Sequence, residues 1–422
     1  MTYFTALRQY TCKRLEEIRS ADIIVGIPCY NNEKTIAHVI QMITHGLDRY
    51  YRELKNVIFI ADGGSTDDTR EVAKEFQIKP WQEKIVSIYR GPAGKGSALR
   101  SVFEAAEKLG VKVCVVVDAD LRSITSEWVK NLISPVLDQD FDFVAPVYLR
   151  HKYDATITNN IVYFMTRTLY GRRIRQPIGG DFALSRRLVK FYTEQNVWET
   201  DVARYGIDIW MTTLAITQGY KLAQARLGTK IHDIKDPVQH LGPMFRQVMW
   251  VLLSLMEQFE NYWQSIEGSQ EVPVYGEIKE AEPQPVNLDF EEMVDRFRTG
   301  YQQFKSIWRE TFSPRIFLAI KRAANLNSSN FRLDPKIWAR ILYELAATFH
   351  AWTRNRFKII ELVTPLYYAR TASFMKETEN LSSAEAESWM EEVALIFEKE
   401  KKYLLQVWEK KKRMGNPDYK TG

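Results

Sequence analysis

The sequence predicts an α/β fold, with a mainly parallel sheet flanked by helices, followed by an α-helical C-terminal region. Up to about residue 240, apolar runs alternate with segments of helical spacing, which indicates βαβ units. The apolar runs lack the alternation of half-exposed strands and are typical of strands covered on both faces. After about residue 290, apolar residues recur at three- and four-residue steps, as they do in helices.

The predicted strands and helices follow one another in a regular order. Strands are expected at 22–30, 56–62, 84–91, 112–120 and 141–148. Helices are expected at 31–43, 94–110 and 205–219, and in the C-terminal region at 290–312, 335–363 and 382–414. Ser382 and Glu385 form a candidate capping box for the last helix. Ligands of parallel sheets bind beyond the carboxyl ends of the strands, so the turns after these strands are the candidate site.

These elements divide the chain into three parts. Residues 1–21 are expected to hold an N-terminal helix, residues 22–245 the sheet domain, and residues 246–422 the helical region. Residues near 267–289 are polar and contain prolines, so we expect a linker or a surface excursion there. A chain of 422 residues is long enough for a large domain and a second one.

Composition and charge narrow the class of protein. With 45% apolar and 26% charged residues, the chain is typical of soluble globular proteins, and a net charge of +5 is too slight to argue for nucleic acid. The three cysteines lack metal spacing and are expected to be free thiols in a reducing cytoplasm. The N-terminus lacks a signal-peptide pattern, and the apolar stretch 248–256 is about half a membrane span. We therefore expect a cytoplasmic protein without a membrane span or a nucleic-acid partner.

A pair of acids, Asp118 and Asp120, follows the apolar run that begins at residue 112. Alternation along a strand would point both side chains to the same side, where two carboxylates repel each other unless a cation joins them. Mg²⁺ and Mn²⁺ favour oxygen ligands and often share one or two carboxylates with substrate phosphates. The pair therefore predicts a site for a metal and a diphosphate. The alternative is a turn with two solvated acids.

Two further turns carry polar groups at strand ends. Asp62 and Ser65 lie in a glycine-containing turn and are candidates to hydrogen-bond a base or a ribose, whereas Thr66 or Asp67 would cap the helix that follows. Lys95 stands between two glycines just before a helix, which favours contact with an anion or a nucleotide. The spacing there fits neither a P-loop nor a dinucleotide fingerprint, and an ordinary loop is the alternative.

Three later segments add candidate ligand-binding groups. Gly179–Gly180 permits an unusual backbone beside Asp181, whose carboxylate would accept hydrogen bonds from sugar hydroxyls. The alternative is a tight turn before a helix that starts near Ser185. Asp208 is embedded in an apolar helix, either on its exposed face or at a site. Arg150 follows a strand and suits a planar carboxylate, although a solvated basic turn needs no ligand.

A metal held by two carboxylates would lack a third protein ligand. His232 and His240 lie in the segment 228–243, and imidazole suits Mn²⁺. Most isolated histidines are structural or solvated, which is the alternative for both residues.

Several motifs taken together resemble a known group of enzymes. They are PCYNNE, DGGSTDDT, GKGSALR, VDADLRS, QPIGGDFALS, YGIDIW and TKIH, in that order along the chain. The set resembles the retaining GT-A glycosyltransferases that make mannosylglycerate, glucosylglycerate and glucosyl-3-phosphoglycerate. The resemblance spans about residues 22–245, together with a helical C-terminal region of similar character. It implies a GT-A fold, which is a Rossmann-like, mainly parallel sheet flanked by helices.

The resemblance also implies roles for individual residues. The nucleotide sugar would contact Pro28, Tyr30, Asn31, Glu33, Asp62, Lys95, Asp118, Ala119, Gly179 and Gly180. The catalytic acids near the reacting sugar would be Asp181 and Asp208, and the metal ligands would be Asp120 and His232. The acceptor would be held by Arg150, Thr156 and Thr158, where spacing differs by about one residue from relatives.

The activity implied is transfer of glucose or mannose, with retention, from a nucleotide sugar to D-glycerate or a related hydroxy acid, with Mg²⁺ or Mn²⁺. The product would be a compatible solute, and the resemblance suggests a homodimer or higher homo-oligomer. Glucosyl-3-phosphoglycerate synthesis is one alternative. An inverting transferase that loads a polyprenyl phosphate, a sugar-phosphate nucleotidyltransferase and an inactive nucleotide-sugar-binding scaffold are others.

Overall fold

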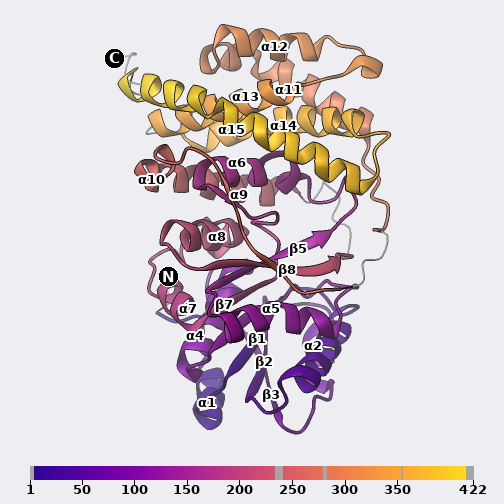
Figure 1. The fold of residues 1–422 in the computed structure, drawn as a ribbon, viewed down its shortest axis with the longest axis vertical. Coiled ribbons are helices and arrows are strands. Elements are labelled where there is room, and N and C mark those ends of the chain that lie inside the picture. The colour runs from indigo at the N-terminus through magenta and orange to yellow at the C-terminus, as the bar shows by residue number, and fades with distance from the viewer. Residues whose placement is uncertain (1–3, 233–240, 279–282, 353–354, 415–422) are drawn as a thin grey trace. The chain divides into compact units, whose positions relative to one another are not determined.

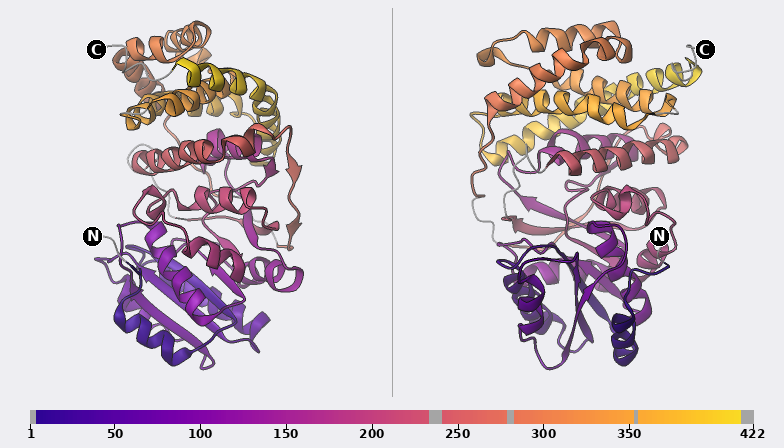
Figure 2. Two further views of the ribbon diagram at one scale, coloured as in Figure 1. Left: turned by 90° about the vertical axis from the view of Figure 1, so that its left-hand side faces the viewer. Right: turned by 180° about the vertical axis from the view of Figure 1, so that it is seen from behind.

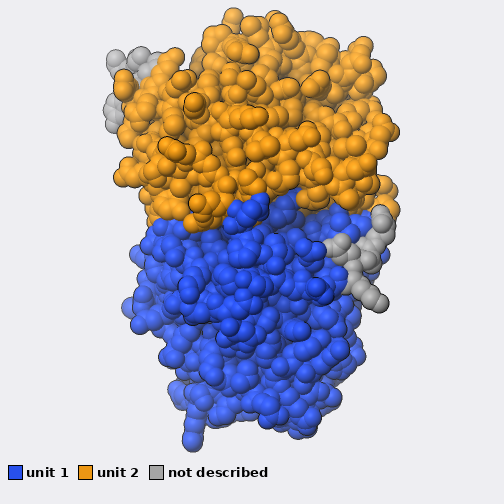
Figure 3. Space-filling model, in the orientation of Figure 1, with its two compact units in different colours: residues 1–150, 174–235, 271–284 blue, residues 151–173, 236–270, 285–422 orange. Residues whose placement is uncertain are grey.

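The computed structural model describes residues 4–232, 241–278, 283–352 and 355–414. Two compact units make up the chain, and Figure 3 colours their residues. Unit 1 consists of Met1–Arg150, Ile174–Lys235 and Glu271–Gln284. Unit 2 consists of His151–Arg173, Asp236–Gln270 and Pro285–Gly422. The domain boundary at residue 245 stays a prediction.

Unit 1 is built on an eight-stranded sheet in the order β10-β8-β5-β7-β4-β1-β2-β3. The strands are β1 (Ile23–Cys29), β2 (Asn56–Asp62), β3 (Gln82–Ile88), β4 (Val113–Val116), β5 (Phe143–Leu149), β7 (Phe182–Ser185), β8 (Leu222–Thr229) and β10 (Val274–Tyr275). Neighbouring strands pair in parallel, except that β7 runs antiparallel to both β4 and β5. The carboxyl ends of β4, β5 and β8 and the amino end of β7 therefore share one edge of the sheet.

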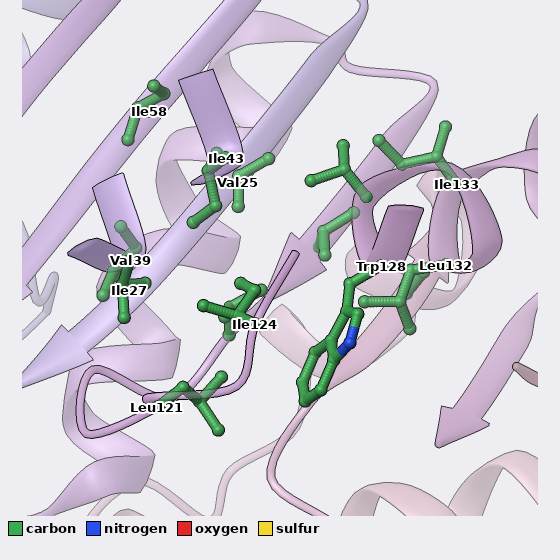
Figure 4. Packing of buried hydrophobic residues seen from close by; sticks show 14 of the residues in the cluster. Val25, Ile27, Val39, Ile43, Ile58, Leu121, Ile124, Trp128, Leu132 and Ile133 are labelled. Atoms are coloured by element: carbon green, nitrogen blue, oxygen red, sulfur yellow. The ribbon is translucent and has the colours of Figure 1, made fainter. Parts of the chain in front are cut away.

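Helices cover both faces of this sheet (Figures 1 and 2). They are α1 (Gln9–Ile18), α2 (Ile36–Tyr51), α3 (Thr69–Glu75), α4 (Lys95–Leu109), α5 (Ser126–Gln139), α7 (Arg186–Thr193), the short 3₁₀ helix η2 (Asp201–Ala203) and α8 (Ile207–Thr217). On one face, buried residues of β1, β2 and β4 pack with α2 and α5. Leu121 and Ile124 join this core beside Trp128 of α5 (Figure 4), which fixes the chain just after the two acids that follow β4.

Unit 2 is helical. Its elements are the π-helix η1 (Thr158–Val162), α6 (Tyr163–Tyr170), α9 (Leu241–Gln258), α10 (Glu260–Gln264), α11 (Phe290–Thr311), α12 (Pro314–Ala324), the 3₁₀ turn η3 (Ser328–Asn330), α13 (Pro335–Ala351), α14 (Phe357–Glu377) and α15 (Ser383–Met414). The short strands β6 (Arg172–Arg173) and β9 (Gln270–Glu271) pair with each other. Helix α13 packs against α15, and α11 packs against α14. Among the described residues, the helices include none long and apolar enough to cross a membrane.

The predicted fold class is confirmed, and some element boundaries are corrected. The strand expected at 112–120 ends at Val116, so both acids of the pair lie beyond it. The helix expected at 335–363 is two helices, α13 and α14. The capping box is confirmed, since the Ser382 amide donates to Glu385 Oε2 at 2.7 Å and the Glu385 amide donates to Ser382 Oγ at 3.2 Å. The helix start near Ser185 is also confirmed, because Ser185 Oγ accepts from the Leu188 amide.

Candidate active site

Five charged side chains meet at the carboxyl edge of the unit 1 sheet, and we call them the edge cluster. Asp118 follows β4, Asp181 precedes β7 and Lys230 follows β8, so strand pairing brings all three to this edge. Lys95 is the first residue of α4, and Asp208 lies in the first turn of α8. Members of the edge cluster that contact each other are thus 23 to 113 positions apart in the sequence.

Lys95 connects two acids of the edge cluster. Its ammonium group lies 2.9 Å from Asp118 Oδ1 and 3.3 Å from Asp208 Oδ2, and it donates to the Gly180 carbonyl at 3.3 Å. Among the described residues, no hydrogen-bond donor reaches the other oxygen of Asp208, although that oxygen is buried. The Asp208 carboxylate therefore has acceptor capacity left for a ligand.

Lys230 connects the other two acids. Its ammonium group lies 3.0 Å from Asp118 Oδ2 and 2.8 Å from Asp181 Oδ2, and it donates to the Gly179 carbonyl at 2.9 Å. The Asp118 amide donates to Asp181 Oδ1 at 2.8 Å, and the Tyr148 hydroxyl donates to Asp181 Oδ2. Both oxygens of Asp181 are thus occupied by donors from the protein itself.

Glycines allow the close approaches that this geometry needs. Gly180 has φ +93°, and a Cβ there would stand 2.0 Å from Asp118 Oδ2. At Gly96, a Cβ would stand 1.9 Å from the Val202 carbonyl oxygen of η2. The Gly96 amide donates to the Arg204 carbonyl at 3.1 Å, so it is occupied rather than exposed to an anion. The glycines beside Lys95 thus hold the start of α4 against the segment that leads to α8.

Burial and charge shift the pKa values of the edge cluster in opposite directions. Burial disfavours the ionised form of Asp118, but the ammonium groups of Lys95 and Lys230 outweigh it and hold the pKa of Asp118 well below its usual range. Burial raises the pKa of Asp208, and the Lys95 ammonium offsets this rise only in part. Burial also raises the pKa of Asp181, although the Lys230 ammonium opposes the rise. Carboxylates with pKa values perturbed in this way are typical of functional sites.

The two loops after β1 and β2 hold each other. The Asn31 amide donates to Ser65 Oγ at 2.9 Å, and Asn31 Oδ1 accepts from the Thr66 amide at 2.9 Å. Asp62 is fully buried and accepts from the amides of Gly64 and Ser65, so it shapes its own turn. Its predicted contact with a base or ribose stays a prediction.

Other predicted nucleotide residues lie around the same loops. Glu33 and Asp67 bridge them, since the Glu33 amide donates to Asp67 Oδ2 and the Asp68 amide donates to Glu33 Oε2. Asp67 also accepts from the Thr69 amide at the start of α3, in line with its expected structural role. Tyr30 is 59% exposed beside Pro28, and a flat exposed ring in this position is suited to stacking on a base.

The predicted metal ligands lie on two paired segments. Leu121 and His232 form an antiparallel bridge, and the Arg122 amide donates to the Ile231 carbonyl at 2.9 Å. Asp120 directly precedes Leu121, so this pairing places the Asp120 backbone next to that of His232; the two side chains are half-buried. Within the described ranges, no group of three or more His, Cys, Asp or Glu side chains is placed to hold a metal. His240, the alternative imidazole, lies outside the described residues.

The predicted acceptor residues fall in both units. The Arg150 guanidinium stacks on the Tyr148 ring of unit 1, 5.0 Å from its centroid. Thr156 and Thr158 belong to unit 2 and are buried there, and the Thr156 hydroxyl lies 2.6 Å from the Tyr367 hydroxyl. Ala119 supplies a backbone contact, since its carbonyl accepts from Thr35 Oγ1 at 2.8 Å. The roles of these residues toward a ligand stay predictions.

Comparison with protein families classifies part of the chain. Residues 24–197 match the family described as Glycosyl transferase family 2. The chain carries a glycosyl transferase family 2 domain. This match confirms the resemblance to GT-A enzymes at the level of the family and the fold. Asp208 and Lys230 of the edge cluster lie beyond the matched segment of the family 2 domain.

The family 2 domain also has counterparts among solved structures, while the comparison with curated proteins gave no match. A glucosyl-3-phosphoglycerate synthase from Mycobacterium tuberculosis, in complex with Mg²⁺ and UDP, is 25% identical over 59% of this chain and 84% of its own, with a TM-score of 0.44. The same enzyme with Mn²⁺, UDP-glucose and phosphoglyceric acid is 23% identical over 59% and 85%, with a TM-score of 0.43. At TM-scores below 0.5, these likenesses do not indicate what this chain binds.

Lys230 and Tyr148 belong to the candidate active site but were not expected from the sequence. Lys230 stands two residues before His232 in the TKIH motif, and only the histidine of that motif suggests a metal ligand. Tyr148 stands near the end of β5 in an apolar run and reads as a core residue. Recognising residues 222–229 as a strand would predict that Lys230 lies at the carboxyl edge of the sheet.

Proposed function

We propose that this chain is a metal-dependent hexosyltransferase that moves glucose or mannose from a nucleoside-diphosphate sugar to D-glycerate or a related small hydroxy acid, with retention of anomeric configuration. The observation that carries the proposal is the edge cluster, which places Asp118, Lys95 and the partly unsatisfied Asp208 at the ligand-binding edge of a family 2 domain.

Charge balance supports the need for a divalent cation. The edge cluster contains three carboxylates and two ammonium groups, and both lysines are paired with carboxylates. A diphosphate would therefore meet little uncompensated positive charge from these side chains. Asp120 and His232 fit a site in which the protein supplies two ligands and the donor's phosphates supply others. When bound, the cation would supply positive charge against the departing diphosphate.

The side chains of the chain itself then have distinct tasks. The loops after β1 and β2, with Pro28, Tyr30, Asn31, Glu33 and Asp62, would hold the base and ribose. Lys95 would help to balance charge on the departing diphosphate, because its pKa is raised by Asp118 and Asp208 despite burial and it stays protonated at neutral pH. Asp208, with one open oxygen, would face the sugar and stabilise positive charge at its anomeric carbon.

The transfer exchanges one bond at the anomeric carbon for another. The bond from that carbon to the diphosphate oxygen breaks, and the electron pair leaves with the oxygen. The acceptor hydroxyl oxygen attacks from the same face, and its proton passes to the departing phosphate oxygen. Arg150, which already lies on the Tyr148 ring, would pair with the acceptor's carboxylate and place its hydroxyl.

A matrix of donors and acceptors tests the proposal. GDP-, UDP- and ADP-linked glucose and mannose would be incubated with glycerate, lactate or 3-phosphoglycerate and Mn²⁺ or Mg²⁺, and products followed by NMR of the anomeric proton. We expect one donor and one acceptor to give an α-linked product from an α-linked donor. Slow donor hydrolysis without an acceptor would still show an active enzyme and would exclude an inactive scaffold.

The matched control is Asp140→Asn, which alters an exposed aspartate of the same unit, outside the site. It should retain full transfer, whereas Asp208→Asn should not. A chain that neither transfers nor hydrolyses any of these sugars would contradict the proposal. A β-linked product would contradict retention alone.

A further inference from the structure

Lys230 has no hydrogen left for a ligand. Its side chain is 3% exposed, and its ammonium group lies within 3.0 Å of three acceptors, Asp118 Oδ2, Asp181 Oδ2 and the Gly179 carbonyl. An ammonium group has three hydrogens, so each of them has a partner. The Lys230 ammonium also lies over the Tyr148 ring, 4.8 Å from its centroid. This lysine is therefore built into the site rather than presented to a substrate.

Asp181 is committed in the same way. It is fully buried, its Oδ1 accepts from the Asp118 amide, and its Oδ2 accepts from Lys230 and from the Tyr148 hydroxyl. The Tyr148 ring is itself held by Trp128, with ring centroids 5.5 Å apart. A sugar could approach the Asp181 carboxylate only by displacing these donors.

Asp208 differs from Asp181 in the respect that matters for a ligand. One of its oxygens lies 3.3 Å from the Lys95 ammonium, and no donor among the described residues reaches the other. A buried acceptor without a hydrogen-bond partner lowers the stability of the folded state. A sugar hydroxyl, or positive charge that develops on the sugar, would supply the missing partner.

We propose, on the basis of the transferase function above, that Asp181, Lys230 and Tyr148 form a positioning unit that holds the Asp118 backbone in place. Asp208 is then the carboxylate of the edge cluster that contacts the donor sugar. This assignment gives Lys230 and Tyr148 a role and replaces the expectation that Asp181 and Asp208 act together as catalytic acids. A side chain placed in this way acts through Asp118, not on the reacting atoms.

The first test is a thermal-unfolding cycle on the ligand-free full chain. Lys230→Met should lower Tm by at least about 5 °C, because removing one partner leaves buried carboxylates unpaired. Adding Asp181→Asn should recover much of that loss, since the amide can still accept from the Asp118 amide without needing a cation. Lys221→Met and Asp140→Asn form the matched cycle at an exposed pair, where the two changes should be small and additive. Additive losses at Lys230 and Asp181 would overturn the proposal.

The second test separates positioning from chemistry. Tyr148→Phe keeps the ring and removes only the hydroxyl that donates a hydrogen bond to Asp181. With the donor sugar found in the matrix, we expect this variant and Asp181→Asn to keep kcat within about tenfold of the wild type while raising the donor KM. Asp208→Asn should lower kcat by about 100-fold or more. Equal losses of kcat in Asp181→Asn and Asp208→Asn would overturn the assignment.

The two tests also separate this inference from the proposed function. Titration of UDP and of GDP with Mn²⁺ into the wild type checks the nucleotide site directly. If neither binds, the transferase proposal fails, while the thermal cycle still decides whether Lys230 and Asp181 form a coupled unit. If either binds and the thermal cycle is additive, the nucleotide site stands and the positioning unit fails.

Discussion

The Arg167 guanidinium of unit 2 and the edge cluster of unit 1 both join buried cations to carboxylates, but they differ in what remains unsatisfied. Arg167 is 1% exposed and donates to Glu398 at 2.7 Å, to Glu391, to the Tyr163 hydroxyl and to Ser269. Its acids lie nearer the surface than the guanidinium does, with exposed fractions of 47% and 18%, so water can complete their hydrogen bonds.

In the edge cluster the acids are the buried members. Asp181 is 0% exposed and Asp208 9%, and one oxygen of Asp208 has no donor among the described residues. Neither unit uses its buried charges as simple stabilising pairs, because desolvation offsets most of the attraction between them. The two regions thus differ in the acceptor capacity that Asp208 keeps, which a donor sugar would use under the proposed function.

The largest effect expected from this comparison is on catalysis. Asp208→Asn should lower kcat by about 100-fold or more, because under the proposed function it removes the negative charge that would face the sugar. The same variant should leave the folded state intact, since the amide can still accept from Lys95. Steady-state kinetics and a circular-dichroism melt measure both properties. A variant that unfolds, or one with full kcat, would place Asp208 among the structural charges.

Unit 2 should show the reverse pattern. Arg167→Met should lower the free energy of unfolding by about 2 kcal/mol, because two carboxylates and a tyrosine hydroxyl lose a charged hydrogen-bond partner. Chemical denaturation with urea measures this loss. Affinity for the nucleoside diphosphate and Mn²⁺, measured while the protein is folded, should not change. A loss of nucleotide affinity without a loss of stability would contradict the assignment of Arg167 to structure.

A smaller effect should appear in the pH dependence of stability. Burial raises the pKa of Asp208 above its ordinary value of 3.8. The ammonium groups of Lys95 and Lys230 oppose this rise, and the Asp118 carboxylate adds to it. Below pH 3.8 the carboxyl is protonated in both the folded and the unfolded chain. As the pH rises from 3.8 to the raised pKa of Asp208 in the folded state, ionisation stabilises the unfolded chain before it stabilises the folded chain. The wild type therefore loses stability relative to Asp208→Asn, which has no carboxyl group at this position.

Melts of both proteins between pH 3 and pH 8 measure that difference, with Asp140→Asn as the exposed control. The Tm of Asp208→Asn minus that of the wild type should increase with pH and then level off. A difference that decreases with pH would mean that the folded state favours the ionised carboxylate, contrary to the burial seen here.

The smallest effect concerns the capping box of α15. Ser382→Ala should lower the free energy of unfolding by about 1 kcal/mol, because the Glu385 amide loses its acceptor. Ser388→Ala, at an exposed position further along α15, changes a side chain that does not accept from the Glu385 amide and is the matched control. Urea denaturation of both variants measures the difference. Equal losses would remove the capping box from the account of this helix.

Local patterns predicted the fold, and strand ends predicted much of the candidate site. Apolar runs without alternation indicated the parallel strands, and the acids after β2 and β4 do lie at one edge of the sheet. The antiparallel β7 has only four residues, too few for a periodic signal that predicts a strand. The acid pair was placed on the strand itself, although β4 ends at Val116 and both carboxylates project from the turn that follows.

The remaining site residues depend on contacts that no local pattern encodes. Lys230 lies 112 residues from Asp118 and 49 from Asp181, and its partners become visible only when β8 pairs with β5. Tyr148 is an ordinary apolar position by sequence until its hydroxyl is seen beside Asp181. The position of Lys95 before a helix predicts a place in the site, but only the strand order brings Lys230 to Asp118.

Calorimetry with Mn²⁺ and a nucleoside diphosphate tests most directly whether the carboxyl edge of the unit 1 sheet binds a nucleotide through a divalent cation. UDP and GDP would each be titrated into the wild type, Asp120→Asn and Asp140→Asn, with Mn²⁺ and with EDTA. We predict that one nucleotide binds the wild type and Asp140→Asn only when Mn²⁺ is present, and that Asp120→Asn loses this binding. Equal affinity of Asp120→Asn and the wild type, or binding that EDTA leaves unchanged, would contradict the account.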